Sequence, residues 1–136
     1  MPPTDRDEAE KLLEEVIDEV GLYPRDAYIF VQEGLGYTVS KIHGTRRKKE
    51  GESRHVSGQD LCNGLREYAQ QKWGLMAGAV LGRWNVNRTL DFGKIVFALV
   101  DKGLMQKTDE DQLDDFRDVY DFKNAFEAGY RIEMKT

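Results

Sequence analysis

Residues 89–105 read TLDFGKIVFALVDKGLM, and this stretch decides the fold that the sequence predicts. Thr89 is placed to cap a helix whose first turn contains Asp91, and apolar residues then recur at spacings of three and four up to Gly103. The apolar stripe consists of Phe92, Ile95, Val96, Leu99 and Val100. Because Leu104 directly follows the glycine that closes the helix, a strand is expected to begin there.

Two further helices are expected upstream of this stretch. Ser57 and Asp60 form the pattern of a capping box, in which a hydroxyl and a carboxylate satisfy the first free N–H groups of a helix. Gly74 ends that helix, and a shorter one follows. Trp73 and Trp84 lie near the ends of the two helices, where they are expected to pack in the core rather than to stack on bases. The three expected helices are 57–73, 75–84 and 89–102.

Downstream of Gly103, the pattern changes from helical to alternating. Residues 116–122 (FRDVYDF) alternate as a strand does, and the acidic loop 108–115 joins them to a short strand at 104–107. Three helices followed by a hairpin resemble a winged-helix domain, whose third helix enters the major groove of DNA and whose hairpin forms the wing. The predicted fold class is therefore α+β and mostly helical. One core is expected to bury Leu65, Phe92, Ile95, Val96, Leu99 and Tyr120.

Two additional helices are expected before this winged-helix-like unit. The stretch 4–20 carries one apolar stripe on an otherwise charged helix, and Pro24 is placed to open a second helix. Gly34 and Gly36 lie inside the second helix, where they favour close packing against another helix rather than a phosphate site. A chain of 136 residues fits a single domain. Its expected parts are the helical pair 4–43, a flexible basic loop at 44–56, the winged-helix-like unit 57–122 and a short C-terminal helix at 123–130.

The composition is that of a folded protein with a well-hydrated surface. Hydrophobic residues make up 40% of the chain and charged residues 33%, with a net charge of −5. This balance can fill a core, which excludes disorder of the whole chain. The sequence shows no apolar run that predicts a membrane span and no secretory signal. A single cysteine cannot form an internal disulfide, so a cytoplasmic location is expected.

Charge is distributed unevenly along the chain. Acidic residues dominate 1–19 and 108–121, whereas basic residues dominate 45–54. Because an acidic wing would repel duplex DNA, the favoured function is a macromolecular interaction module with a protein partner. The alternative is a nucleic-acid-binding winged-helix protein that neutralises phosphates with the basic loop and the helix starting at Thr89. Its candidate contacts are Arg46, Arg47, Lys48, Lys49, Arg54, Arg88 and Lys94.

No arrangement of residues predicts an enzyme, a metal site or a cofactor. His43 and His55 match no metal-ligand spacing, and no nucleophile motif or phosphate-binding loop is complete. The acidic run that starts at Asp109 lacks the glycine and the final glutamate of a calcium loop. Cys62 lies on the apolar face of its helix without a motif that supplies a base. It is therefore expected to resist thiol reagents in the folded protein and to react on unfolding.

Several short strings resemble those of the Minf family, a small group of bacterial proteins of unknown function. The strings are RHVSGQ at 54–59, DFG at 91–93 with IVF at 95–97, GL at 103–104 and VYDF at 119–122. The resemblance covers most of residues 23–127, and it excludes the basic stretch 45–53 and the residues after Tyr130. It implies a bacterial source and no activity, so no catalytic residue follows from it.

Overall fold

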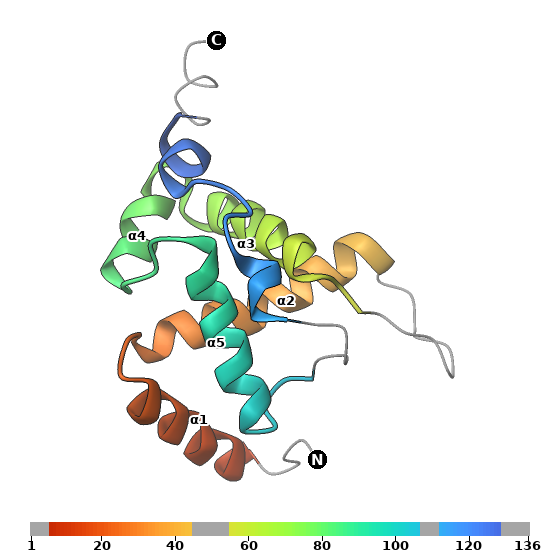
Figure 1. The fold of residues 1–136 in the computed structure, drawn as a ribbon, viewed down its shortest axis with the longest axis vertical. Coiled ribbons are helices and arrows are strands. Elements are labelled where there is room, and N and C mark those ends of the chain that lie inside the picture. The colour runs from red at the N-terminus through yellow and green to blue at the C-terminus, as the bar shows by residue number, and fades with distance from the viewer. Residues whose placement is uncertain (1–5, 45–54, 107–111, 129–136) are drawn as a thin grey trace.

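The computed structural model describes residues 6–44, 55–106 and 112–128 of the chain. These ranges contain α1 (Arg6–Val20), α2 (Arg25–His43), α3 (Gly58–Trp73), α4 (Ala77–Arg83) and α5 (Thr89–Asp101). Three short helical turns complete them, namely η1 (Gly74–Met76), η2 (Leu113–Phe116) and the π-helical η3 (Asn124–Ala128). The described residues form no strand, so the predicted α+β class is wrong and the fold is helical (Figure 1).

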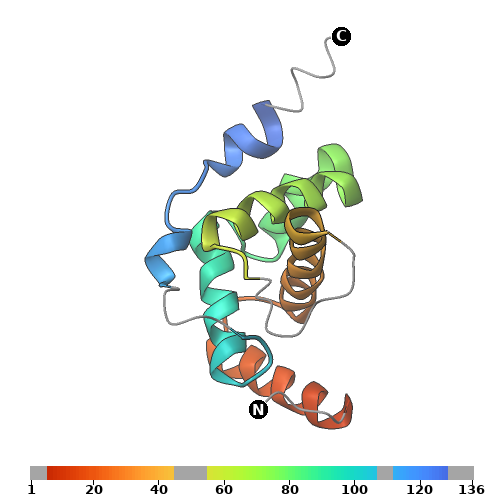
Figure 2. The ribbon, with the colours of Figure 1, turned by 90° about the vertical axis from the view of Figure 1, so that its right-hand side faces the viewer.

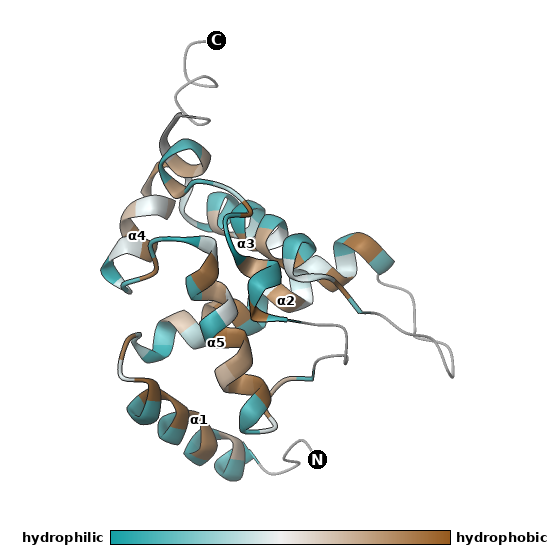
Figure 3. Cartoon of the chain, in the orientation of Figure 1, coloured by the Kyte–Doolittle hydropathy of each residue, from teal (hydrophilic) through white to brown (hydrophobic). Residues whose placement is uncertain are grey.

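Helix α5 lies at the centre of the molecule. It contacts α1, α2, α3 and η2, and α1 lies at the opposite end of the molecule from α4 (Figure 2). The buried residues of α5 are Thr89, Leu90, Asp91, Phe92, Gly93, Ile95, Val96 and Leu99. The hydropathy pattern agrees, since α1 turns its hydrophilic side outward while much of α5 is hydrophobic (Figure 3). Burial of these apolar side chains around one helix stabilises the fold by the hydrophobic effect.

The helix starts predicted after Pro24, after Ser57 and at Thr89 are confirmed, with one difference in how α5 is capped. Helix α4 begins at Ala77 rather than at residue 75, and the start predicted at residue 4 lies outside the described residues. The Ser57 hydroxyl accepts a 3.0 Å bond from the Asp60 N–H, as the capping box requires. At α5, the expected cap Thr89 is instead the first helical residue. The carboxylate of Asp91 accepts the backbone N–H groups of Asn87 and Arg88, at 2.9 and 3.2 Å. A carboxylate satisfies these donors better than a hydroxyl because it is charged.

Asp91 also ties α5 to the turn that follows α1. The Tyr23 hydroxyl donates a 2.6 Å hydrogen bond to its carboxylate, and both side chains are buried. Burial, followed by this bond to Asp91, raises the pKa of Tyr23. The carboxylate thus accepts three donors inside the protein, which compensates for its removal from water. In a winged helix this residue would face the DNA bases, and here it holds the core together.

Helices α2 and α3 approach closely because glycines occupy the crossing. A Cβ atom on Gly64 would lie 1.8 Å from Thr38 Oγ1, and one on Gly34 would lie 2.2 Å from Leu65 Cδ2. The packing role predicted for Gly34 is therefore confirmed. The same role predicted for Gly36 is wrong, because a Cβ atom on Gly36 would have no other atom within 4 Å. The Thr38 hydroxyl donates a 2.7 Å hydrogen bond to the Gly34 carbonyl. This bond satisfies the buried hydroxyl within the contact between the two helices.

The predicted hairpin at 104–122 is wrong. The acidic loop predicted at 108–115 lies partly outside the described residues. Residues 112–126 form a segment that we call the C-terminal strap. The strap contains the η2 turn and then irregular backbone, including Asp118 at a φ of 51°. The period of two at 116–122 does not hold in the structure, because Asp118 is exposed while its neighbour Val119 is partly buried against the core. The Val119 N–H, which a strand would donate to its neighbour, donates instead to the Thr89 hydroxyl at 3.1 Å.

Phe116 anchors the strap between α3 and α5. Its ring occupies a notch in which Cβ atoms on Gly58 and Gly93 would approach it to 3.0 and 2.7 Å. Only 3% of Phe116 is exposed. Further along, the Tyr120 hydroxyl donates a 2.6 Å bond to the Cys62 carbonyl. The strap therefore closes the core over α3 and α5 in place of a wing.

Most of the predicted core is confirmed. Leu65, Phe92, Ile95, Val96 and Leu99 are buried. Tyr120 is only partly buried and packs against the cluster. Cys62 is fully buried, as expected for a structural cysteine. The predicted C-terminal helix at 123–130 corresponds to η3 over Asn124–Ala128, and its last residues lie outside the described ranges.

Alkaline pH is expected to destabilise the protein through its buried neutral groups. Burial raises the pKa of the Cys62 thiol from 9.0 to about 12 and that of the Tyr28 phenol from 10.0 to about 12. Because the folded chain holds these protons more tightly than the unfolded chain, the stabilisation is complete below pH 9 and is lost toward pH 12. The free energy of unfolding should fall by about 1.4 kcal/mol per pH unit for each titrating group.

Urea unfolding at a series of pH values measures this effect. The variant Cys62→Ala removes the group that titrates first, so its stability should begin to fall about one pH unit later than that of the wild type. An unfolding free energy that stays constant from about pH 8 to pH 11 would contradict the burial of both groups.

Candidate protein-interaction surface

Large apolar side chains are exposed where α3 passes into α4. Leu75 and Met76, on the η1 turn, are 54% and 60% exposed. They follow Trp73, which together with Trp84 remains only partly buried. We call Trp73, Leu75, Met76 and Trp84, with the neighbouring cations Lys72 and Arg83, the α3–α4 surface. Exposed apolar side chains gathered at one place commonly mark a contact site for another molecule.

The two tryptophans of this surface form a rigid pair. Their ring centroids lie 5.3 Å apart in an edge-to-face arrangement, and Phe30 of α2 packs against both rings at 5.2 and 5.9 Å. Phe30 in turn contacts Phe92 at the centre of the core. Such aromatic contacts fix the rings in place. The surface therefore presents its partly exposed indoles in one orientation. The prediction that both tryptophans pack in the core is confirmed only in part.

The cations of the α3–α4 surface lack ion-pair partners in the described part of the chain. Lys72 and Arg83 are both exposed, and no carboxylate among the described residues forms a salt bridge with either of them. The ammonium group of Lys72 lies 6.0 Å from the Trp73 ring centroid and 5.8 Å from that of Tyr68. Both distances suit a cation–π interaction, which orients the ammonium group without neutralising it.

Four other cations of the described chain form salt bridges, whereas a further six form none with a described carboxylate, namely Arg6, Lys11, Arg66, Arg88, Lys94 and Lys123. Arg25 pairs with Glu10 and Lys41 with Glu67. Lys102 pairs with Glu19 at 2.9 Å, and Arg117 with Asp114 at 2.8 Å. Two of these pairs join cations to the acidic helix α1, whose exposed side is rich in Asp and Glu. The acidic helix α1 lies toward the opposite end of the described molecule from α4 (Figure 1).

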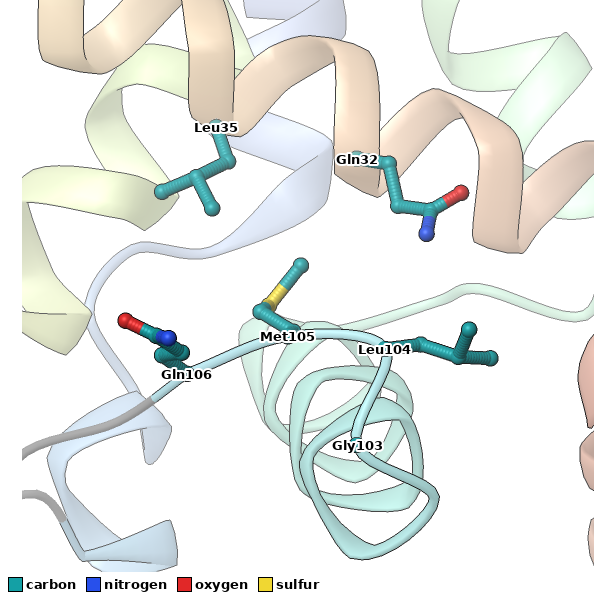
Figure 4. A pocket seen from close by; sticks show the side chains of 6 residues that line it. All are labelled: Gln32, Leu35, Gly103, Leu104, Met105 and Gln106. Atoms are coloured by element: carbon teal, nitrogen blue, oxygen red, sulfur yellow. The ribbon is translucent and has the colours of Figure 1, made fainter. Parts of the chain in front are cut away.

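A groove of about 430 Å³ lies between α2 and the residues that follow α5. It is lined by Gln32, Leu35, Gly103, Leu104, Met105 and Gln106. The Met105 side chain points toward α2, between Leu35 and Gln32 (Figure 4). None of the lining side chains titrates near neutral pH, so the groove offers neither a general acid nor a general base.

The histidines also form no arrangement suited to catalysis. The His43 ring and the backbone oxygen of His55 lie 2.8 Å apart, which brings together the two described residues on either side of the basic stretch. Across the described ranges, no group of three or more His, Cys, Asp or Glu side chains is placed to hold a metal ion. In the same ranges, no helix combines the length and the apolar character needed to cross a membrane.

The predicted nucleic-acid contacts are only partly visible. Arg46, Arg47, Lys48, Lys49 and Arg54 lie outside the described residues. Arg88 is exposed at the start of α5, and Lys94 is partly buried along it. Arg88 is the extended N-cap residue before α5, whereas Lys94 lies within the helix. In addition, α5 is enclosed by four other elements and cannot lie in a DNA groove as a recognition helix does.

Sequence reasoning missed the exposure of Leu75 and Met76. The available signal was Gly74, which ends α3 in a left-handed conformation with a φ of 54°. A chain reversal at a glycine often lies at the surface, so the two apolar residues that follow it were candidates for exposure.

Comparison with known protein families, with curated proteins and with solved structures finds no match to this chain. The resemblance to the Minf family therefore stays a prediction.

Proposed function

We propose that this protein is a non-enzymatic protein-binding module and that the α3–α4 surface is its contact site. The observation that carries the proposal is the exposure of Leu75 and Met76, which closely follow the partly exposed Trp73 along the chain. Aromatic residues, Met and Arg are enriched at the centres of protein interfaces, and Trp and Arg supply many of the residues that dominate binding energy. The α3–α4 surface combines these residue types with a fixed indole geometry, which lowers the entropy cost of binding.

Two features support a protein rather than a nucleic acid as the partner. The described residues contain no wing, and α5 is too enclosed to act as a recognition helix. The α3–α4 surface also offers more apolar than cationic side chains, whereas nucleic-acid affinity depends mainly on Lys and Arg. The proposal places the module in the cytoplasm, where a single buried thiol persists without a disulfide partner.

Affinity capture with a matched pair of variants tests this function. The immobilised wild type, a Leu75→Glu/Met76→Glu double variant and an Ile42→Glu control are each incubated with nuclease-treated lysate of the source organism. Ile42 is 47% exposed on the last turn of α2, so its replacement adds a comparable charge away from the proposed site. Circular dichroism and burial of Cys62 confirm that all three chains are folded.

The expected result is a protein that binds the wild type and the control but binds the double variant at least about 30-fold more weakly. That factor corresponds to a loss of about 2 kcal/mol, as for residues that dominate an interface. Equal capture by the wild type and the double variant would overturn the proposed site. A parallel capture from untreated lysate is the comparison: binding seen there that is lost after nuclease treatment would overturn the protein-binding function in favour of nucleic acid.

A further inference from the structure

The sequence contains one Asn-Gly pair, at residues 63 and 64, and the structure places it at the close contact between α2 and α3. Asn63 is exposed on α3, whereas Gly64 is buried against Thr38 of α2. A Cβ atom on Gly64 would lie 1.8 Å from Thr38 Oγ1, so the packing requires a glycine there. The pair therefore joins a residue that the packing fixes to one that the packing leaves open.

The Asn63 side chain has no structural role in the described part of the chain. It is exposed and forms no hydrogen bond with another described residue. The other asparagines of the chain, Asn85, Asn87 and Asn124, each precede a residue that carries a side chain. Asn85 also donates a 3.2 Å hydrogen bond to the carbonyl of Leu22. Asn63 thus differs from the other three in its neighbour, and from Asn85 in the freedom of its amide.

An asparagine that precedes glycine in a flexible chain loses its amide without an enzyme. The backbone nitrogen of the glycine loses its proton and attacks Cγ of the asparagine, and ammonia leaves as a five-membered succinimide ring closes. Water then adds to one of the two ring carbonyls and opens the ring. The products are aspartate and isoaspartate, in which the chain runs through the side-chain carboxyl. Glycine favours the reaction because it has no side chain that hinders the attacking nitrogen.

Helix α3 blocks this reaction while the protein is folded. Gly64 lies inside α3, where the helical pattern pairs its N–H with the carbonyl of Asp60, four residues earlier. Ring closure needs this nitrogen to be free, and it needs the ψ angle of Asn63 to leave the helical value of about −42°. Both changes require α3 to unwind, which the burial of Cys62 and Leu65 in the core opposes.

The contact with α2 opposes the same unwinding. Thr38 lies against Gly64 and is only 1% exposed, and the Leu65 side chain lies where a Cβ atom on Gly34 would be. The backbone of α3 therefore cannot change its conformation at Gly64 without moving away from α2. Reaction at Asn63 needs an opening that separates the two helices, and such openings of a core contact are rare.

We infer that Asn63 is a deamidation site that reacts when α2 and α3 separate, and that the reaction makes this opening irreversible. Isoaspartate at residue 63 lengthens the backbone by one carbon atom directly before Gly64. The N–H and carbonyl groups of α3 on either side of it then no longer pair four residues apart, and Gly64 loses its place against Thr38. A molecule that opens and reacts leaves the folded population, whereas one that closes first is unchanged.

Mass spectrometry of the full chain during incubation at mildly alkaline pH tests the inference. One sample is folded and the other is unfolded in guanidinium chloride, and peptide mapping locates the mass gained when an amide becomes a carboxyl. Conversion at Asn63 should be at least about tenfold faster in the unfolded sample, because opening is rare in the folded protein. Asn85, Asn87 and Asn124 are internal controls and should react more slowly than Asn63 in the unfolded sample.

Three variants show what controls the rate. Asn63→Gln should show no conversion at residue 63 and should fold like the wild type, since Asn63 forms no described hydrogen bond. Leu65→Ala weakens the contact between α2 and α3 and should raise the rate at Asn63 in native buffer at least about tenfold. Ile42→Ala removes a side chain that is 47% exposed on α2 and should leave that rate unchanged.

A second route is available if Leu65→Ala does not fold. Its rate in native buffer should then equal the rate of the unfolded wild type, and wild type in increasing denaturant should convert faster as the unfolded fraction rises. Equal rates at Asn63 in the folded and the unfolded wild type would overturn the inference. A rate in the unfolded chain that is no higher at Asn63 than at the other asparagines would overturn it as well.

Refolding tests the irreversible step. Chains with isoaspartate at residue 63 are purified from the unfolded sample and diluted out of denaturant. They should not regain the circular dichroism signal of the wild type, and complete refolding would contradict the irreversible step. None of these measurements involves a partner protein, so their failure leaves the proposed function to the lysate capture.

Discussion

Replacing Gly64 with alanine is expected to lower the free energy of unfolding by about 3 kcal/mol, the upper end of what overpacking a core costs. The added methyl group would meet Thr38 Oγ1 at 1.8 Å, and Thr38 Cβ at 2.8 Å. Neither atom can move freely, since Thr38 is buried and its hydroxyl bonds to the Gly34 carbonyl. The two helices must therefore separate, which weakens the contact along its length. Urea unfolding followed by circular dichroism measures the change.

Gly36→Ala is the matched control for this variant. Gly36 belongs to the same helix as Thr38, but a Cβ atom on it has nothing within 4 Å. Alanine there should stabilise the protein by up to about 1 kcal/mol, because glycine is a poor helix former. Adding Thr38→Ala to Gly64→Ala should recover part of the lost stability, because it removes Oγ1 and Cγ2, two of the three Thr38 atoms that clash. Similar stabilities for Gly64→Ala and Gly36→Ala would contradict the close approach of α2 and α3.

Replacing Phe116 with alanine is expected to cost about 3 to 5 kcal/mol and to open the C-terminal strap. The ring is the strap's anchor in the notch formed by Gly58 and Gly93. Loss of the anchor should also expose Cys62, whose carbonyl accepts the Tyr120 hydroxyl of the strap. The rate at which a thiol reagent labels Cys62 under native conditions should rise at least about tenfold, since local opening then needs less free energy.

Two further variants define what this labelling measures. Gly93→Ala leaves Phe116 in the chain but fills its notch, since the new Cβ would lie 2.7 Å from the ring. It should therefore raise the labelling rate as well. Arg117→Ala alters only an exposed residue of the strap and its surface pair with Asp114, so its stability should stay within about 0.5 kcal/mol of the wild type. Slow labelling of Cys62 in Phe116→Ala would contradict the role of the strap as its cover.

The sequence predicts the helices of this fold well because their signals are local. Ser57 and Asp60 lie three residues apart and satisfy each other's backbone groups, whatever packs around them. The strap was mistaken for a hairpin because its apolar residues pack on the helices from irregular backbone, in which Val119 and Tyr120 both face the core while Asp118 is exposed. Only tertiary structure separates the two, as in the Val119 N–H that bonds to Thr89.

The candidate site could not be predicted from the sequence. Apolar residues such as Leu75 and Met76 look the same in a sequence whether they are buried or exposed, and exposed apolar atoms are common on protein surfaces. Which cations have a salt-bridge partner among the described residues likewise depends on where the carboxylates of other elements lie. Composition indicated a binding protein with an uneven charge, but it could not locate the surface.

The glycine contact between α2 and α3 also fixes the register of the two helices. Sliding α3 by one turn, about 5.4 Å, would bring Asp60 or Tyr68 to the place that Gly64 occupies against Thr38. Neither side chain fits a gap that excludes even a methyl group. Gly64 lacks a Cβ atom, and only such a residue fits against Thr38. The other registers that an amphipathic helix pair could adopt are therefore excluded. Because the described residues form no sheet that could align the helices, this contact helps to select a single native arrangement.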